Sequence, residues 1–232
     1  MLKAVLFDMG GTLIHFAGDD LQMYRHSFEE VAQHHWERQQ EILAAYDEYV
    51  RLRNIGLFTL REATFQEALE RAAYDFSELE IADLLEELNR EQLKRASLYP
   101  ESATTLSALT DLGVQLGLVS NIPFPGDLLA RTLSAFDIRK YFEVVVSSSD
   151  VGFRKPHPDI FLSALEAMNV DAADALYVGD APDKDVAGAH TVGMKAAWIN
   201  RKAEENPMTL PDYEIASLRE LIPIAQNLLN ER

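Results

Sequence analysis

Four short clusters of residues combine side chains that could do chemistry with glycines or prolines, and each follows an apolar run. They are Asp8–Thr12, Ser120–Asn121, Gly152–Pro158 and Tyr177–Gly188. A carboxylate such as Asp8 can serve as a nucleophile or as a hard oxygen ligand for Mg²⁺. A serine hydroxyl and an asparagine amide can donate to a phosphoryl oxygen, and a lysine placed before two prolines is a fixed cation. Each cluster alone also fits ordinary turn chemistry, or capping of a helix by Asp183.

The apolar runs before these clusters predict the strands of a parallel sheet. They are rich in Val, Leu and Ile and lack polar alternation, as expected for strands buried on both faces. The predicted strands are Ala4–Phe7, Val114–Val119, Val144–Val146, Ala175–Val178 and Ala196–Ile199. Helical patterns alternate with them at Ser102–Leu112, Pro125–Phe136, Pro158–Met168 and Asp183–Thr191. This alternation predicts a doubly wound (Rossmann-like) α/β domain, whose ligands bind where the strands end.

One long segment, residues 16–97, interrupts this alternation and contains no strand-like run. It predicts amphipathic helices over Leu21–Arg38, Glu41–Arg53, Leu60–Asp75 and Ser77–Arg95. We therefore expect a discontinuous α/β core, residues 1–15 and 98–232, and an all-helical cap domain, residues 16–97. Within this cap, Tyr24, Arg25 and His26 are candidates to face the cleft, whereas Trp36, like Trp198 of the core, is interpreted as a packing residue.

The composition restricts the partners of the chain. The 232 residues include 38 acidic and 21 basic side chains, a net charge of −17, and residues 16–97 hold 18 of the acidic and 9 of the basic ones. This excess argues against broad binding of nucleic acid or of an anionic membrane, but it does not exclude one small phosphate. The lack of cysteine removes disulfides and thiol chemistry. With no apparent targeting or membrane-spanning segment, we expect a cytoplasmic monomer or homodimer.

In this order and spacing, the four clusters resemble the haloacid dehalogenase-like hydrolase superfamily, in its phosphatase-like branch. The shared pattern is a nucleophile loop at Asp8, a Ser120-Asn121 strand end, Lys155 before proline, and Gly179-Asp180 with a second aspartate, Asp185, five residues on. The resemblance spans the core, and the helical segment matches the family's type 1 cap in position. It implies hydrolysis of a small phosphorylated metabolite through an aspartyl-phosphate.

The resemblance also implies roles for individual residues. Asp8 would attack phosphorus, and Mg²⁺ would be held by Asp8, the Gly10 carbonyl and Asp180, with Asp185 in support. Ser120, Asn121, Lys155 and Gly11 would bind the phosphoryl group. Charge on the phosphoryl oxygens would then be met by the metal, the lysine and backbone N–H groups.

Gly10 departs from the family pattern, because phosphatases of this kind usually have an acid/base aspartate at this position. General acid–base assistance is typically worth about 10²–10⁴ in rate. The chain could therefore be slow or restricted to good leaving groups. His15 is a candidate to supply the missing proton, and Asp19 and Asp20 are others, although each of the three also fits a structural role.

Two further classes of function remain open on the sequence. A phospho-ligand sensor without turnover would explain Gly10, and metal-free dehalogenases share part of the pattern. The acidic fourth cluster, Asp180, Asp183 and Asp185, favours a metal-dependent phosphatase over a dehalogenase. Phosphonate-cleaving relatives need a lysine in the cap. The helical segment has only Lys94, at its far end, which argues against this class.

Overall fold

The computed structural model describes residues 1–73, 75–205 and 209–231. Its central feature is a sheet of six parallel strands in the order β5-β4-β1-β6-β7-β8. The strands are β1 (Ala4–Phe7), β4 (Gln115–Ser120), β5 (Val144–Ser147), β6 (Ala175–Gly179), β7 (Lys195–Ile199) and β8 (Tyr213–Ile215). The five predicted strands are confirmed to within a residue or so at each end, whereas β8 was not predicted.

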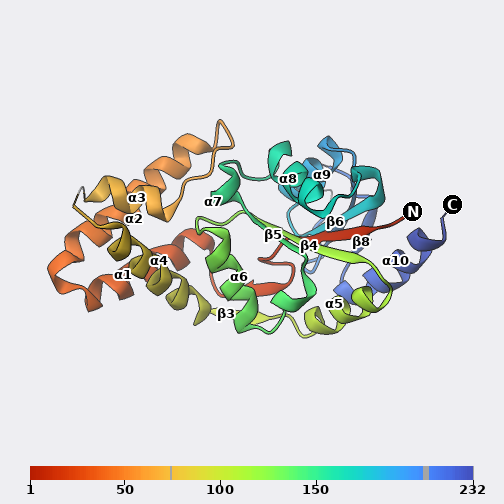
Figure 1. The fold of residues 1–232 in the computed structure, drawn as a ribbon, viewed down its shortest axis with the longest axis horizontal. Helices are drawn as coiled ribbons and strands as arrows, with labels where there is room; N and C mark the ends of the chain where they lie inside the picture. The colour runs from red at the N-terminus through yellow and green to blue at the C-terminus, as the bar shows by residue number, and fades with distance from the viewer. Residues whose placement is uncertain (74, 206–208, 232) are drawn as a thin grey trace.

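Helices cover both faces of this sheet, as a doubly wound fold requires (Figure 1). They are α5 (Ser102–Asp111), α6 (Gly126–Ala135), α7 (Ser148–Val151), α8 (Pro158–Met168), α9 (Ala187–Thr191) and α10 (Leu221–Asn230). Alternate residues of β1 pack into separate apolar clusters: Val5 and Phe7 join α5, α6 and α10, while Ala4 and Leu6 join α8 and α9. The sheet is therefore buried on both faces, which explains its unbroken apolar strands.

A second group of helices stands apart from the sheet, at the left of Figure 1. It consists of α1 (Asp20–His34), η1 (Trp36–Arg38), α2 (Gln39–Gly56), α3 (Phe65–Ala72) and α4 (Glu78–Leu93). Aromatic side chains form its interior, and the Phe65 ring lies 4.6 Å from that of Tyr49 and 5.0 Å from that of Phe28. We call residues 17–95 the helical insert. Its packing confirms that this segment is helical.

The ends of the insert differ from the prediction that residues 16–97 contain no strand. β2 (Ile14–Phe16) and β3 (Ala96–Leu98) form an antiparallel pair in which His15 faces Ser97. Both strands have three residues, too few to show an alternation in the sequence. Only their pairing across the length of the insert makes them strands.

Several local predictions were also wrong. Trp36 is 77% exposed, so it is not a packing residue, in contrast to the buried Trp198. The predicted helix Leu60–Asp75 is shorter, because Thr64 caps α3 by accepting from Glu67 N and the residues before it form a loop. Tyr74, within that predicted helix, lies outside the described residues, as do 206–208 and 232 of the predicted core.

The predicted helix Asp183–Thr191 also begins differently. A π-helical turn, η4 (Pro182–Val186), precedes α9, and Asp183 forms no capping hydrogen bond there. Two other helices begin with side chains or prolines that favour a helix start. Pro158 occupies the first turn of α8, and Ser77 with Glu80 forms a capping box at α4. Within the described residues, no helix is both long and apolar enough to span a membrane.

Candidate active site

The predicted chemical residues gather at one edge of the sheet because three neighbouring parallel strands end there. Asp8 follows β1, Ser120 ends β4, and Asp180 follows β6. Phe7 of β1 pairs with Leu118 of β4 and with Val178 of β6, which aligns these strand ends. The fourth cluster member, Lys155, comes from the loop between α7 and α8.

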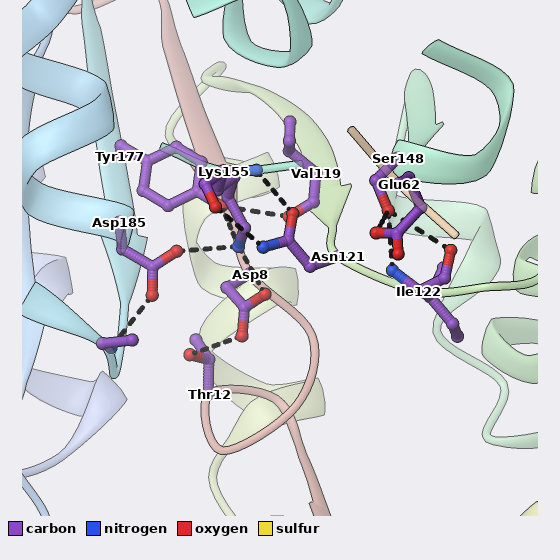
Figure 2. Close-up of polar contacts among 11 residues, drawn as sticks. Asp8, Thr12, Glu62, Val119, Asn121, Ile122, Ser148, Lys155, Tyr177 and Asp185 are labelled. Carbon is purple, nitrogen blue, oxygen red and sulfur yellow. Dashed lines mark hydrogen bonds and ion pairs between the residues drawn. The ribbon is translucent and has the colours of Figure 1, made fainter. Parts of the chain in front are cut away.

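Lys155 connects the predicted residues to one another (Figure 2). Its Nζ donates to Asp8 Oδ1 at 2.6 Å, to Asp185 Oδ1 at 2.7 Å and to the Tyr177 hydroxyl at 2.8 Å. Only 3% of Lys155 is exposed. Burial by itself lowers the pKa of Lys155, but the charges of Asp185 and Asp8 hold this pKa well above its usual value. The lysine is therefore a fixed, buried cation.

Asn121 holds the loop that carries this lysine. Its side-chain Oδ1 accepts from the Lys155 backbone N at 2.7 Å, and its Nδ2 donates to the Lys155 carbonyl at 3.1 Å. Both ends of the Asn121 amide are therefore engaged with the Lys155 backbone. The neighbouring Ser120 lines a cavity above these residues, which is described below, and its hydroxyl forms no hydrogen bond with the described residues.

Asp8, Asp180 and Asp185 form a carboxylate cluster in which one oxygen of each lies within 4.8 Å of the others. Burial raises the pKa of Asp8 to about 6, despite the opposing charge of Lys155. Asp180 opens onto the cavity, yet the protein around it and the charges of Asp8 and Asp185 raise its pKa to about 7. One lysine thus leaves an excess of negative charge in this cluster.

Hard carboxylate oxygens with uncompensated negative charge are a suitable donor set for Mg²⁺. Asp185 is the most constrained member, because its Oδ2 accepts from Ala181 N at 3.0 Å while Oδ1 accepts from Lys155. Asp8 and Asp180 are engaged less completely: Asp8 Oδ2 accepts only a long bond, 3.4 Å, from Thr12 Oγ1. The residues present therefore fit the metal that the sequence predicted, with Asp185 in a supporting position.

Glycines bring the Asp8 loop close to Asp180. Gly11 has φ of +75°, and a Cβ at this position would overlap the Asp180 carboxylate. Its N–H donates to Ile14 O at 2.9 Å, so it is already used within the loop. Gly10 differs, because the nearest side-chain atoms to a Cβ there would belong to Phe16, at 3.8 Å. The structure therefore leaves room for a side chain at residue 10 but not at residue 11.

A cavity of about 460 Å³ lies over the cluster, between the sheet edge and the helical insert. From the insert and its connecting strands, its wall includes His15, Asp20, Tyr24 and Gln92. The other two predicted cleft residues, Arg25 and His26, pair with Glu29 and Glu30 one turn further along α1 and do not line the cavity. For them, the predicted cleft position was wrong, because the helix turns them away.

The candidate proton donors occupy different positions. His15 lines the cavity from β2, with its ring 5.9 Å from that of Tyr99. Asp20 also lines it, from the first residue of α1. Asp19 instead caps α1 by accepting from Leu21 N and Gln22 N, which confirms the structural alternative for that residue.

Three residues missed by the sequence analysis hold the site together. Arg201 donates to the Gly11 and Thr12 carbonyls, pairs with Glu101 at 2.6 Å and stacks over Tyr99. The Tyr177 hydroxyl donates to Val119 O and accepts from Lys155. Trp198 Nε1 donates to the Asp180 carbonyl at 3.0 Å. The position of Tyr177 close to Gly179-Asp180 could have indicated a role in the site. No residue near Arg201 in the sequence indicates that it contacts Glu101 and the Asp8 loop.

The chain belongs to the haloacid dehalogenase-like hydrolase family, whose sequence profile matches residues 2–193. This confirms the resemblance carried by the four clusters. It also agrees with the parallel sheet and with the grouping of Asp8, Lys155 and Asp180 at its edge.

Individual relatives share part of the chain. A phosphoserine phosphatase of Thermus thermophilus is 37% identical over 163 residues, which cover 69% of this chain and 63% of that protein. A phosphoglycolate phosphatase of Escherichia coli is 38% identical over 129 residues, 54% of this chain and 50% of that protein. The chain thus spans one half to under two thirds of the length of these relatives.

Solved structures match nearly the whole chain. A phosphatase of the same family from Thermococcus onnurineus has a TM-score of 0.66 at 28% identity, covering 96% of this chain and 97% of its own. A 2-haloacid dehalogenase from Pseudomonas syringae has a TM-score of 0.70 at 28% identity, covering 98% and 99%. These neighbours share the architecture of sheet and helical insert, although their names describe two different reactions.

Proposed function

We propose that this protein is a Mg²⁺-dependent hydrolase of small phosphate esters that acts through an aspartyl-phosphate on Asp8. The observation that carries the proposal is the placement of Asp8 between a buried cation and two further carboxylates. Lys155 contacts it at 2.6 Å, and Asp180 and Asp185 complete a set of oxygen ligands. The cavity above this cluster suits a small metabolite.

The first step follows from the chemistry of Asp8. A carboxylate oxygen attacks phosphorus, the ester P–O bond breaks, and the leaving oxygen takes up a proton. Water then attacks the phosphorus of the aspartyl-phosphate and releases phosphate, which restores the Asp8 carboxylate. Lys155 and the Ser120 hydroxyl stabilise the phosphoryl oxygens, where charge accumulates.

Mg²⁺ would be held by Asp8, Asp180 and the Gly10 carbonyl, with Asp185 in support, and when bound it would supply positive charge to the phosphoryl group. We assign the Asn121 amide to positioning Lys155, because both of its ends bond to the Lys155 backbone. Gly11 contributes through its small size, which allows Asp180 to approach.

Because residue 10 is glycine, the site lacks the aspartate that usually donates a proton to the leaving oxygen. His15 of β2 and Asp20 of α1 both lie on the cavity wall and are titratable. We propose that His15 supplies the proton, because it lies at the base of the insert close to the Asp8 loop, and that turnover is slow unless the leaving group is good. Residues 16–97 would act as a cap over a core of residues 1–15 and 98–232.

Two other functions each have one observation in their favour. A phospho-ligand sensor without turnover is favoured by Gly10. A metal-free dehalogenase is favoured by the likeness to the Pseudomonas syringae enzyme. The carboxylate cluster weighs against the metal-free dehalogenase, because the charge of Lys155 balances only one of the three carboxylates and the others repel each other without a metal ion.

The test compares the wild type with Asp8→Asn on a panel of phosphate esters that includes phosphoserine and phosphoglycolate. We expect phosphate release by the wild type with Mg²⁺, loss of at least about 10³-fold in the variant, and loss on chelation. Equal activity of the two proteins would contradict the proposal. Tight binding of an ester without turnover would indicate the sensor, and halide release under chelation would indicate the dehalogenase.

A further inference from the structure

One arginine on the cavity wall has no anionic partner among the residues that the structure describes. Arg154 precedes Lys155, lines the same cavity as Asp8 and is partly buried. Its guanidinium forms no ion pair and no side-chain hydrogen bond with the residues that the structure describes. A guanidinium that faces a cavity without a carboxylate beside it favours binding of an anion there.

The other cations of this wall are either engaged or exposed. Lys155 is bonded to Asp8 and Asp185, and Arg201 is bonded to Glu101 and to two carbonyls of the Asp8 loop. Lys184 and Lys202 lie in the exposed class. Among the described residues, Arg154 is therefore the partly buried cation of the cavity that is left to meet a ligand.

The backbone of Arg154 is fixed on both sides. Its N–H donates to Leu60 O at 2.8 Å, and Glu62 N donates to Gly152 O at 3.0 Å. A loop of the insert therefore pairs with the segment that carries Arg154. The next residue, Lys155, is held by Asn121. The position from which the Arg154 side chain enters the cavity is therefore fixed by backbone hydrogen bonds on both sides.

Glu62 is a candidate for an internal partner of Arg154, but its carboxylate already accepts hydrogen bonds. It is 5% exposed, and it accepts from Ala63 N at 3.1 Å. It also accepts from Ser148 Oγ at 2.5 Å (Figure 2). Burial raises the pKa of Glu62, and Arg154 is the strongest opposing influence. The two groups therefore affect each other at a distance without forming an ion pair.

We propose that Arg154 is a specificity-determining residue that binds a carboxylate on the substrate, at the end away from the phosphoryl group. The planar guanidinium can donate two parallel hydrogen bonds to a carboxylate. Phosphate binding at Lys155 and carboxylate binding at Arg154 would then select small phosphorylated acids. The catalytic part of this inference rests on the proposed function.

The experiment compares two esters of similar size, 2-phosphoglycolate and the neutral 2-hydroxyethyl phosphate. In the wild type we expect the higher kcat/KM for 2-phosphoglycolate. Arg154→Gln should reduce the ratio of the two kcat/KM values by about 10- to 100-fold, the range expected for a charge-assisted hydrogen bond. The ratio for Arg154→Lys should lie between those of the wild type and Arg154→Gln, because lysine keeps the charge but loses the paired donors.

Glu62→Gln provides the matched control for a purely structural role of Arg154. If Arg154 only neutralises Glu62 and holds the insert loop, the two variants will change both esters alike and the ratio will stay constant. A constant ratio in Arg154→Gln overturns the proposal. A ratio that falls in Arg154→Gln but not in Glu62→Gln supports it.

Calorimetric binding of the two esters separates this inference from the proposed hydrolase activity. If the wild type hydrolyses no ester of the panel, the proposed function fails, and the ratio of the two dissociation constants replaces the kinetic ratio. Preferential binding of 2-phosphoglycolate that disappears in Arg154→Gln would still support the role of Arg154. Equal binding of the two esters by the wild type, or no binding of either, would overturn it.

Discussion

The side-chain amide of Asn121 bonds at both ends to the backbone of Lys155, accepting from its N–H and donating to its carbonyl. The two residues are 34 positions apart in the chain. This pair fixes the loop from which Lys155 reaches Asp8 and Asp185. The position of the buried cation therefore depends on an amide at the end of β4.

Replacing Asn121 tests this dependence. Asn121→Ala leaves the Lys155 N–H and carbonyl without partners and frees the loop, so we expect kcat to fall by about 10-fold or more. The thermal midpoint should fall by only a few degrees. Steady-state phosphate release and a thermal scan provide the two measurements. An unchanged kcat would show that Lys155 keeps its position without the amide.

Restoring a carboxylate at residue 10 tests the missing proton donor. A side chain fits there, since the atoms nearest to a Cβ are those of Phe16 at 3.8 Å. Gly10→Asp should raise the hydrolysis of alkyl phosphates by about 10²-fold and that of aryl phosphates much less, because aryl leaving groups need no proton. Assays of both ester types measure the contrast. If His15→Ala in the wild type costs nothing and Gly10→Asp gains nothing, water suffices as the proton source.

Gly11 and Gly113 form a matched pair for testing the approach of Asp180. Both have positive φ, +75° and +80°, so an alanine strains the backbone of each. Only at Gly11 would the new Cβ meet the Asp180 carboxylate, whereas nothing lies within 4 Å at Gly113. Gly11→Ala should therefore lose Mg²⁺ affinity by about 10-fold or more, and Gly113→Ala should lose stability alone.

Calorimetric titration with Mg²⁺ and urea unfolding separate the two effects. Equal Mg²⁺ affinity in the two alanine variants would contradict a role for the contact between Gly11 and Asp180.

The raised pKa values of Asp8 and Asp180 predict pH-dependent metal binding. Protons compete with Mg²⁺ for these carboxylates, whose pKa values are about 6 and about 7 without metal. The Mg²⁺ affinity should rise from about pH 5 to about pH 8 and level off above this range, with protons released on binding. Calorimetry in buffers of different ionisation enthalpy measures that release.

Without metal, the same two carboxyls should make the folded protein less stable as pH rises, whereas the Mg²⁺ affinity increases with pH. Because the folded state holds protons on Asp8 and Asp180 more tightly than the unfolded state, the contribution of these two groups to the free energy of unfolding should fall as pH rises from about 4 to about 7. Saturating Mg²⁺ should reduce this fall. Urea unfolding at several pH values, with and without Mg²⁺, provides the measurement. A rise over this range without metal would contradict the repulsion within the cluster.

The amino-acid sequence by itself determined the α/β core, the helical insert and the grouping of Asp8, Ser120, Lys155 and Asp180. Each strand is an apolar run with a polar residue after it, and parallel neighbouring strands bring such residues to one edge. These features depend on local patterns and on one general rule of topology. They could be predicted without knowing which side chains touch.

Only the tertiary structure decided the contacts that join distant segments. Arg201 bonds to Glu101, 100 residues away in the sequence, and to the Asp8 loop, 190 residues away. β2 pairs with β3 although the whole insert separates them in the sequence. The direction of a side chain on a helix or loop also depends on packing, which turned Arg25 toward solvent and Arg154 toward the cavity. No local pattern encodes such pairings, because their free energy comes from atoms that become neighbours only when the chain folds.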